Sequence, residues 1–162
     1  MRRAAPIIPL ILSSAFFGYQ TRATEVVELR PSDPVYTKQG KGVYLDQCAS
    51  CHGVNLEGQL GWRDKKVDGM RLAPPHDKSG HTWHHPDELL FKLTKYGFQA
   101  MIGKEYKVSM PVYEGLLSDA EIIAALSYIK STWPSEIKEI HDKINADYKL
   151  NKKMENMGNV EK

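Results

Sequence analysis

Both cysteines of this 162-residue chain lie in one short motif, Cys48-Ala49-Ser50-Cys51, and His52 follows it directly. A Cys-x-x-Cys-His run is typical of the covalent attachment of haem c. The spacing suits this chemistry, because two thiols have to reach two vinyl groups on one edge of a porphyrin. The adjacent imidazole can then ligate the iron. With both cysteines used in this way, no disulfide remains to staple the fold, so the motif predicts a chain that folds around one haem.

Two other kinds of site also use a Cys-x-x-Cys pair. A thioredoxin-like redox pair needs the two thiols but does not require His52. A structural zinc site needs two more thiol or imidazole ligands at a matched spacing, and the sequence has no second Cys-x-x-Cys motif. Haem attachment therefore explains the motif best. It predicts that Cys48 and Cys51 form the thioether links and that His52 is the proximal axial ligand.

The first residues have the pattern of an export signal. Residues 1–3 are basic, residues 4–17 are mostly apolar, and residues 21–23 offer a small-residue cleavage site. The apolar stretch is short for a membrane span. We expect a signal peptide over residues 1–23 and a periplasmic protein that is soluble after cleavage. Cleavage after Ala15 and an uncleaved membrane anchor are the alternatives.

Removal of that segment changes the charge balance of the chain. The full sequence has 22 basic and 20 acidic residues, which gives a net charge of +2. The segment contains three arginines and no acidic residue, so 19 basic residues would remain against 20 acidic ones. No basic stripe with interleaved aromatic residues appears, and we expect no nucleic-acid partner. The remaining length suits one domain with a modest core.

Helical signals predict an all-α protein, and no strand signal of any strength appears. Residues 24–35 are expected to be an extended lead-in, because Pro31 and Pro34 block a helix there. A helix is then predicted from Tyr36 to Cys48, ending where the haem motif begins. The stretch over residues 53–80 is rich in glycine and proline, and a loop of that length in a compact domain has to wrap something, such as a haem.

The second half of the chain predicts three more helices. One begins near Pro86 and ends at Gly97, and a loop follows over residues 98–117. Another follows the capping box Ser118-Asp119-Ala120-Glu121 and ends before Pro134. An additional amphipathic helix is expected over residues 135–150, with an apolar stripe, and a disordered polar tail over residues 151–162. The stripe consists of Ile137, Ile140 and Ile144.

Met110 is the favoured distal ligand of the iron. A second strong ligand makes an electron-transfer centre, whereas an open position makes a binding or catalytic one. Met110 lies in a loop, precedes Pro111 and stands shortly before the capping box. Any single methionine can instead be a core filler. The other candidates are Met70, Met101, Met154 and Met157.

Four histidines crowd into the ten residues from position 76 to position 85, namely His76, His81, His84 and His85. Any of them could serve as the distal ligand in place of Met110. A histidine-rich cluster could also bind copper or zinc. Against both hypotheses, His84 and His85 stand at a helix start, where side chains commonly serve capping.

These motifs resemble class I c-type cytochromes over residues 36–134. Gly40 and Tyr44 precede Cys48 by eight and four residues, like the glycine and the aromatic of that family. Tyr128 looks like the aromatic that packs on this glycine where the N- and C-terminal helices cross. The resemblance implies an all-α, cytochrome c-like fold in which three to five helices wrap one covalently bound haem c.

The resemblance also extends to the site. Met110-Pro111-Val112-Tyr113 is similar to the family's distal-methionine loop. Ala73-Pro74 resembles the turn whose carbonyl accepts the proton of the proximal histidine, and by that analogy Pro74 orients His52. Trp83 looks like the tryptophan that can hydrogen-bond a haem propionate, although core packing would also explain it.

A protein of this kind is implied to be a single-haem electron carrier and not an enzyme, although a subunit of a larger oxidoreductase fits too. Its partners would be redox proteins, either a membrane complex or a dehydrogenase, with no small-molecule substrate; peripheral association with a membrane is also open. The alternatives are a haem enzyme or gas sensor with a labile distal ligand, and a cytochrome that also binds copper. The chain departs from the simplest members in its long loop containing Trp62-Arg63, its histidine-rich segment and its extension over residues 135–162.

Overall fold

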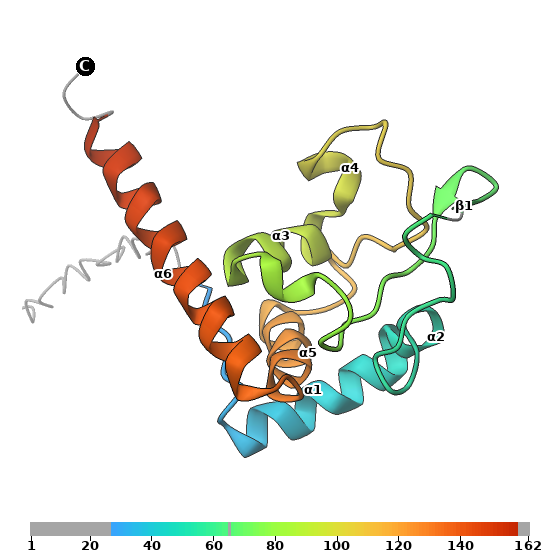
Figure 1. The fold of residues 1–162 in the computed structure, drawn as a ribbon, viewed down its shortest axis with the longest axis horizontal. Helices are drawn as coiled ribbons and strands as arrows, with labels where there is room; N and C mark the ends of the chain where they lie inside the picture. The colour runs from blue at the N-terminus through green and yellow to red at the C-terminus, as the bar shows by residue number, and fades with distance from the viewer. Residues whose placement is uncertain (1–26, 65, 159–162) are drawn as a thin grey trace, which may run out of the picture.

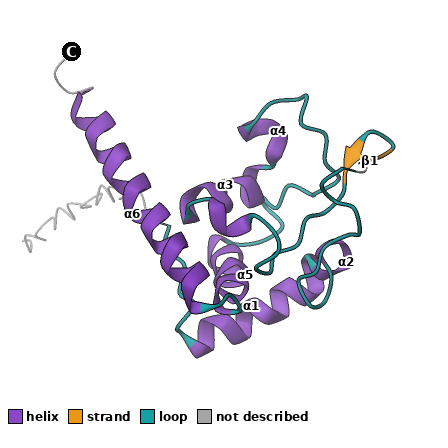
Figure 2. Ribbon diagram, viewed as in Figure 1, coloured by secondary structure: helices purple, strands orange, loops and turns teal. Residues whose placement is uncertain are grey.

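A computed structural model describes residues 27–64 and 66–158. The predicted signal peptide lies outside these residues. The described chain is mostly helical, as the sequence predicts (Figure 1). Long loops connect the helices on the side of the molecule that carries the short hairpin (Figure 2).

Helix α1 spans Pro34–Gln47, and Cys48 separates it from the single turn of α2, Ala49–His52. The sequence predicted that Pro34 blocks a helix and that α1 starts at Tyr36, which was wrong. Proline is tolerated at the first helical position because its nitrogen needs no hydrogen bond there. The Asp33 carboxylate caps α1 by accepting the backbone N–H groups of Val35 and Tyr36.

Helix α5, Asp119–Ser131, crosses α1 in closest contact. It begins with the predicted capping box, in which Ser118 and Glu121 bond each other's backbone N–H groups. A Cβ atom on Gly40 would lie 1.9 Å from the carbonyl oxygen of Ala124, so only glycine permits this crossing. The predicted aromatic neighbour is close by, since the rings of Tyr128 and Tyr44 lie 5.5 Å apart between centroids.

Helix α3 spans Asp87–Tyr96, with Pro86 before it and Gly97 after it, as predicted. The sequence predicted a loop from residue 98, whereas one more helical turn, α4, spans Phe98–Met101. Gly97 has a φ of +82°, which turns the chain sharply between the two helices. A single turn of four residues is too short to show helical periodicity, so no sequence pattern predicts it.

The long loop after α2 contains a small hairpin that the sequence did not predict. Strands β1, Lys66–Val67, and β2, Met70–Arg71, pair antiparallel. Asp68 and Gly69 both have positive φ, which suits a two-residue hairpin turn. All four strand residues are exposed, so the strands lack the alternation of buried and exposed residues that would predict them. A 3-10 turn, η1, follows later in the chain at Thr82–His84.

Helix α6, Ser135–Gly158, projects away from the other helices (Figure 1). The sequence predicted that this helix ends at residue 150 and that a disordered tail follows, but residues 151–158 continue it. Lys152 donates to Glu88 of α3 at 2.6 Å, a contact that the sequence pattern does not reveal. The predicted apolar stripe was also wrong in part. Ile140 is 46% exposed, and the buried residues of α6 are His141 and Asn145.

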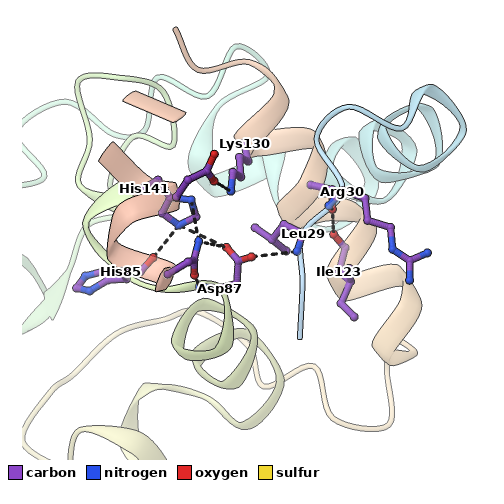
Figure 3. Close-up of polar contacts among 10 residues, drawn as sticks. Leu29, Arg30, His85, Asp87, Ile123, Lys130 and His141 are labelled. Carbon is purple, nitrogen blue, oxygen red and sulfur yellow. Dashed lines mark hydrogen bonds and ion pairs between the residues drawn. The ribbon is translucent and has the colours of Figure 1, made fainter. Parts of the chain in front are cut away.

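A buried polar cluster fastens α6 to α3 and to the chain before α1 (Figure 3). His141 Nε2 donates to the carbonyl oxygen of His85 at 2.9 Å. The Asp87 carboxylate accepts the Asn145 amide at 3.0 Å and the Leu29 backbone N–H at 3.0 Å. Because every member has a partner, the cluster avoids the penalty for burying unpaired polar groups. The extension is therefore packed into the domain at its base.

Candidate haem site

A cavity of about 650 Å³ lies between the α1–α2 junction, α3, α5 and the long loops. This volume falls within the range of about 300–1,000 Å³ that is typical of cofactor pockets. Most of its lining is apolar. Five of the six predicted site residues line this cavity, namely Cys48, Cys51, His52, Pro74 and Met110.

The two cysteines are free thiols at the turn between α1 and α2. The Cys51 backbone N–H donates to the Cys48 carbonyl oxygen at 3.1 Å, which keeps both side chains on the same short turn. Burial, with a smaller contribution from Cys51, raises the pKa of Cys48 to about 11. A redox-active dithiol works the other way, through a thiolate of lowered pKa. This environment therefore counts against the thioredoxin-like alternative.

His52 is buried, and one of its ring nitrogens is already in use. Nδ1 lies 2.8 Å from the Pro74 carbonyl oxygen. A carbonyl only accepts, so Nδ1 carries the proton and Nε2 keeps its lone pair for a metal. Burial lowers the pKa of His52, and the bond to Pro74 opposes this shift in part. The imidazole is therefore held neutral, in the tautomer that an axial ligand needs.

Met110 is partly buried and packs against the core. Its loop is fastened by Tyr113, whose hydroxyl donates to the Gln47 carbonyl oxygen at 2.7 Å. Gln47 ends α1, immediately before Cys48, so this bond joins the Met110 loop to the start of the haem motif. Burial raises the pKa of Tyr113 to about 12, which keeps its hydroxyl protonated as a donor.

The other four methionines lie on the surface outside this cavity lining. Their exposed fractions run from 37% for Met70 to 62% for Met157. None of them lies beside His52 and the cysteines as Met110 does. Of the five methionines that the sequence offered, the cavity singles out the favoured one.

Trp83 is the predicted site residue that the structure does not bring to the cavity. Its indole N–H donates to the Lys78 carbonyl oxygen at 3.3 Å, and its ring stacks on His84 at 3.6 Å. The predicted contact of Trp83 with a haem propionate stays a prediction. Trp62 and Arg63 line the cavity instead. The sequence marked these two only as unusual residues in a long loop.

The histidine-rich segment does not form a metal-binding cluster. His81 stacks on Trp62 at 5.3 Å, His84 stacks on Trp83, and the carbonyl of His85 accepts from His141. His76 stacks on His52 at 4.0 Å. Within residues 27–64 and 66–158, no three histidine, cysteine or acidic side chains come together to hold a metal ion.

These residues fit a haem c. The two thiols, the imidazole with its free Nε2 and the thioether all line one largely apolar cavity. This donor set matches covalent attachment together with two axial ligands.

The family model for cytochrome c matches residues 37–133. The chain belongs to the cytochrome c family. The resemblance seen in the sequence is thereby confirmed, and family membership supports a haem c electron carrier. Most of α6 lies beyond the matched residues.

Curated relatives agree with this assignment. The chain is 31% identical over 97 residues to cytochrome c2 iso-2 of Magnetospirillum fulvum, covering 52% of this chain and 90% of that protein. It is 29% identical to cytochrome c2 iso-2 of Magnetospirillum molischianum, covering 52% and 89%. Subunit CcoP of the cbb3-type cytochrome c oxidase of Azospirillum brasilense is 28% identical, covering 62% of this chain and 30% of that protein. No solved structure matches the chain.

Over residues 27–64 and 66–158, no helix combines the length and the apolar character that a membrane crossing requires. This finding does not extend to the apolar stretch at residues 4–17, which lies outside the described residues.

Proposed function

We propose that this protein is a single-haem c-type cytochrome that carries single electrons between exported or membrane-bound redox proteins. The observation that carries this proposal is the meeting of Cys48, Cys51, His52 and Met110 at one cavity. The predicted export signal and the cytochrome c2 relatives support a periplasmic location. The relative named as an oxidase subunit supports a redox protein as partner.

Cys48 and Cys51 would hold the haem through two thioether bonds, His52 would ligate the iron from the proximal side, and Met110 from the distal side. When bound, haem c supplies an iron that alternates between Fe(II) and Fe(III). The chain's own contribution is to keep both ligands in place in the two states. Pro74 fixes the imidazole of His52, and Tyr113 fastens the loop that presents the thioether of Met110.

Two side chains held in this way move little when one electron is gained or lost. A thioether ligand stabilises Fe(II), so a His/Met pair raises the reduction potential. The apolar lining excludes water and strengthens the same preference, because burial disfavours the additional charge of Fe(III). The cavity therefore suits a carrier of fairly high potential.

Absorption spectroscopy of the holoprotein tests the distal ligand. The oxidised protein is expected to show the weak far-red band that reports a bond between methionine sulfur and iron. Met110→Ala should abolish this band and lower the reduction potential by a sizeable part of the ~0.8 V that axial ligands can span. Met101→Ala is the matched control, because Met101 is exposed outside the cavity lining. A far-red band that survives in the Met110 variant would remove this residue from the site.

A second candidate function is a gas sensor or enzyme with a labile distal ligand. The observation that favours it is that the Met110 loop is fastened through Tyr113, while a thioether accepts hydrogen bonds only weakly, so the sulfur would be held mainly by its bond to iron. Carbon monoxide mixed with the reduced wild-type protein at neutral pH separates the two functions. Slow or absent binding is expected of the carrier, and rapid binding would favour the sensor.

A further inference from the structure

His76 meets the proposed axial ligand ring to ring. The imidazoles of His52 and His76 stack with their centroids 4.0 Å apart and their planes 24° from parallel. His76 thus lies on the same side of the cavity as the proximal ligand. A distal ligand has to approach from the opposite side, so this stacking also removes His76 from the candidates for that position.

His76 is itself held at several points. Its Nδ1 lies 2.7 Å from the Thr82 hydroxyl, and its carbonyl oxygen accepts the Trp133 indole N–H at 2.8 Å. Its backbone N–H donates to the Leu56 carbonyl oxygen at 2.8 Å. The backbone of His76 is therefore held in place, and the bond at Nδ1 restrains the ring as it presents a flat surface to His52.

The backbone at Leu56 shows how firmly the position of His76 is determined. Leu56 has a φ of +67°, which a residue with a branched side chain rarely adopts. Its carbonyl oxygen accepts the N–H groups of both His76 and Asp77. Strained backbone persists only where the surroundings over-determine it, and such sites cluster where geometry matters for function.

The bond to Pro74 fixes the His52 imidazole at only one point. A single hydrogen bond at Nδ1 still lets the ring rock about its Cβ–Cγ bond. A flat partner on one ring face removes this motion, because tilting would bring the two rings into contact. Together, the bond and the stacked ring define a plane.

We propose that His76 is a positioning residue that fixes the plane of the His52 imidazole about the iron. The proposal rests on the proposed function, since it takes His52 as an axial ligand. The orientation of an axial imidazole plane governs how unpaired spin spreads over the porphyrin of the oxidised, low-spin iron. Residues that orient a ligand in this way tune a metal centre without touching the metal.

Proton NMR of the oxidised holoprotein measures this orientation through the paramagnetic shifts of the four haem methyl groups. His76→Leu keeps an apolar side chain but removes the flat ring, and the order of the four methyl resonances is expected to change. His76→Phe restores a flat ring and should return the wild-type order. His84→Leu is the matched control, because His84 is exposed and stacks on Trp83 outside the cavity. It should leave the order unchanged.

The proposal is overturned if His76→Leu keeps the wild-type order, or if His76→Phe disturbs it as much as His76→Leu does. Should His76→Leu fail to fold, Thr82→Val takes its place, because it removes only the hydroxyl that holds His76 Nδ1. A smaller displacement of the same resonances is then expected, and the wild-type pattern in that variant overturns the proposal.

The far-red band separates this result from a failure of the proposed function. If the wild-type protein lacks the band, the His/Met centre itself is wrong. If all variants show the band while the methyl order never changes, the carrier stands and only the role of His76 falls.

Discussion

The two sides of the cavity hold their proposed ligands in different ways. On the proximal side, His52 has its own hydrogen bond to Pro74 and a stacked ring beside it. On the distal side, Met110 has a sulfur atom that accepts hydrogen bonds only weakly, and its loop is held through the neighbouring Tyr113. The proximal ligand is thus fixed directly, and the distal ligand is fixed through the loop that carries it.

This difference suggests how the centre divides its tasks. A directly fixed imidazole determines where the iron binds. A thioether on a fastened loop then supplies the second ligand, and loss of this thioether should leave the position of the imidazole unchanged. Changes on the proximal side should therefore affect the whole site, whereas changes on the distal side should affect only the bond to iron.

The largest effect is expected from His52→Ala. Because altering even a residue that only orients a ligand typically lowers metal affinity by 10–100-fold, removing the ligand should lower the yield of intact holoprotein by roughly that factor or more. Met110→Ala should keep covalently attached haem at near wild-type yield. Haem staining after denaturing electrophoresis, compared with the absorption spectrum, measures both. An equal loss of attached haem in the two variants would contradict the proposed difference between the proximal and distal sides.

Gly40→Ala tests the support of the proximal side, because α1 leads directly into Cys48. The added methyl group would meet the Ala124 carbonyl oxygen at 1.9 Å, and a backbone atom cannot move aside cheaply. We expect the free energy of unfolding to fall by about 1–3 kcal/mol or more. Chemical denaturation of the holoprotein measures it.

Gly42→Ala is the matched control in the same helix. Nothing lies within 4 Å of a Cβ atom there, so alanine should stabilise the protein by about 1 kcal/mol through its helix propensity. A Gly40 variant as stable as the Gly42 variant would show that the crossing of α1 and α5 is looser than the structure has it.

Acid should weaken the anchoring of α6 to His85 and Asp87. Burial, followed by the charge of Lys130, lowers the pKa of His141, while Asp87 opposes the shift. The unfolded chain therefore takes up a proton near pH 6.5 before the folded one does. This contribution to stability is complete above about pH 6.5 and falls as the pH drops towards the folded pKa. A single histidine can contribute up to about 1.4 kcal/mol per pH unit.

Denaturation at pH 7 and at pH 5.5 measures this contribution. His141→Gln should reduce the difference between the two values, whereas His84→Gln, which alters an exposed histidine, should leave it unchanged. An unchanged difference in the His141 variant would contradict the assignment.

The smallest effects are expected from two tyrosine variants, one on each side of the cavity, and they compare the two sides most directly. Tyr44→Phe removes a hydroxyl that donates to the Gly53 carbonyl oxygen on the proximal side, and Tyr113→Phe removes one that donates to Gln47 on the distal side. Each should cost about 0.5–1.5 kcal/mol of stability. Only Tyr113→Phe should weaken the far-red band and speed carbon monoxide binding. The same response from both variants would mean that the two sides are not independent.

Candidate site residues could be named from the sequence more readily than the structure of the loops. Cys48, Cys51 and His52 are adjacent in the chain, so their meeting needs no knowledge of the fold. Met110 was favoured by its loop, by the proline after it and by the capping box that follows, and Pro74 by resemblance to a family; both line the cavity with His52. The capping box at Ser118 and the glycine after α3 mark their helix ends through local chemistry alone, which is why those boundaries were correct.

What the sequence could not show depends on contacts between distant residues. The stacking of His76 on His52 joins positions 24 residues apart, and a histidine-rich run hides which of its members matters. Lys152 near the end of α6 meets Glu88 of α3, and the buried residues of α6 are polar, so an apolar stripe was misleading there. Trp83 does not line the cavity, and its indole N–H donates to the nearby Lys78 carbonyl oxygen.

Helix α6 also gives the molecule a rigid handle. Its 24 residues span about 36 Å at 1.5 Å per residue, and its base is fastened while its far end projects from the other helices. A dye or an electrode linker attached near Met157 would sit at a nearly fixed distance from the cavity. The protein could thus be tethered to a surface through this end in a uniform orientation, with the face around Cys51 left open to solution.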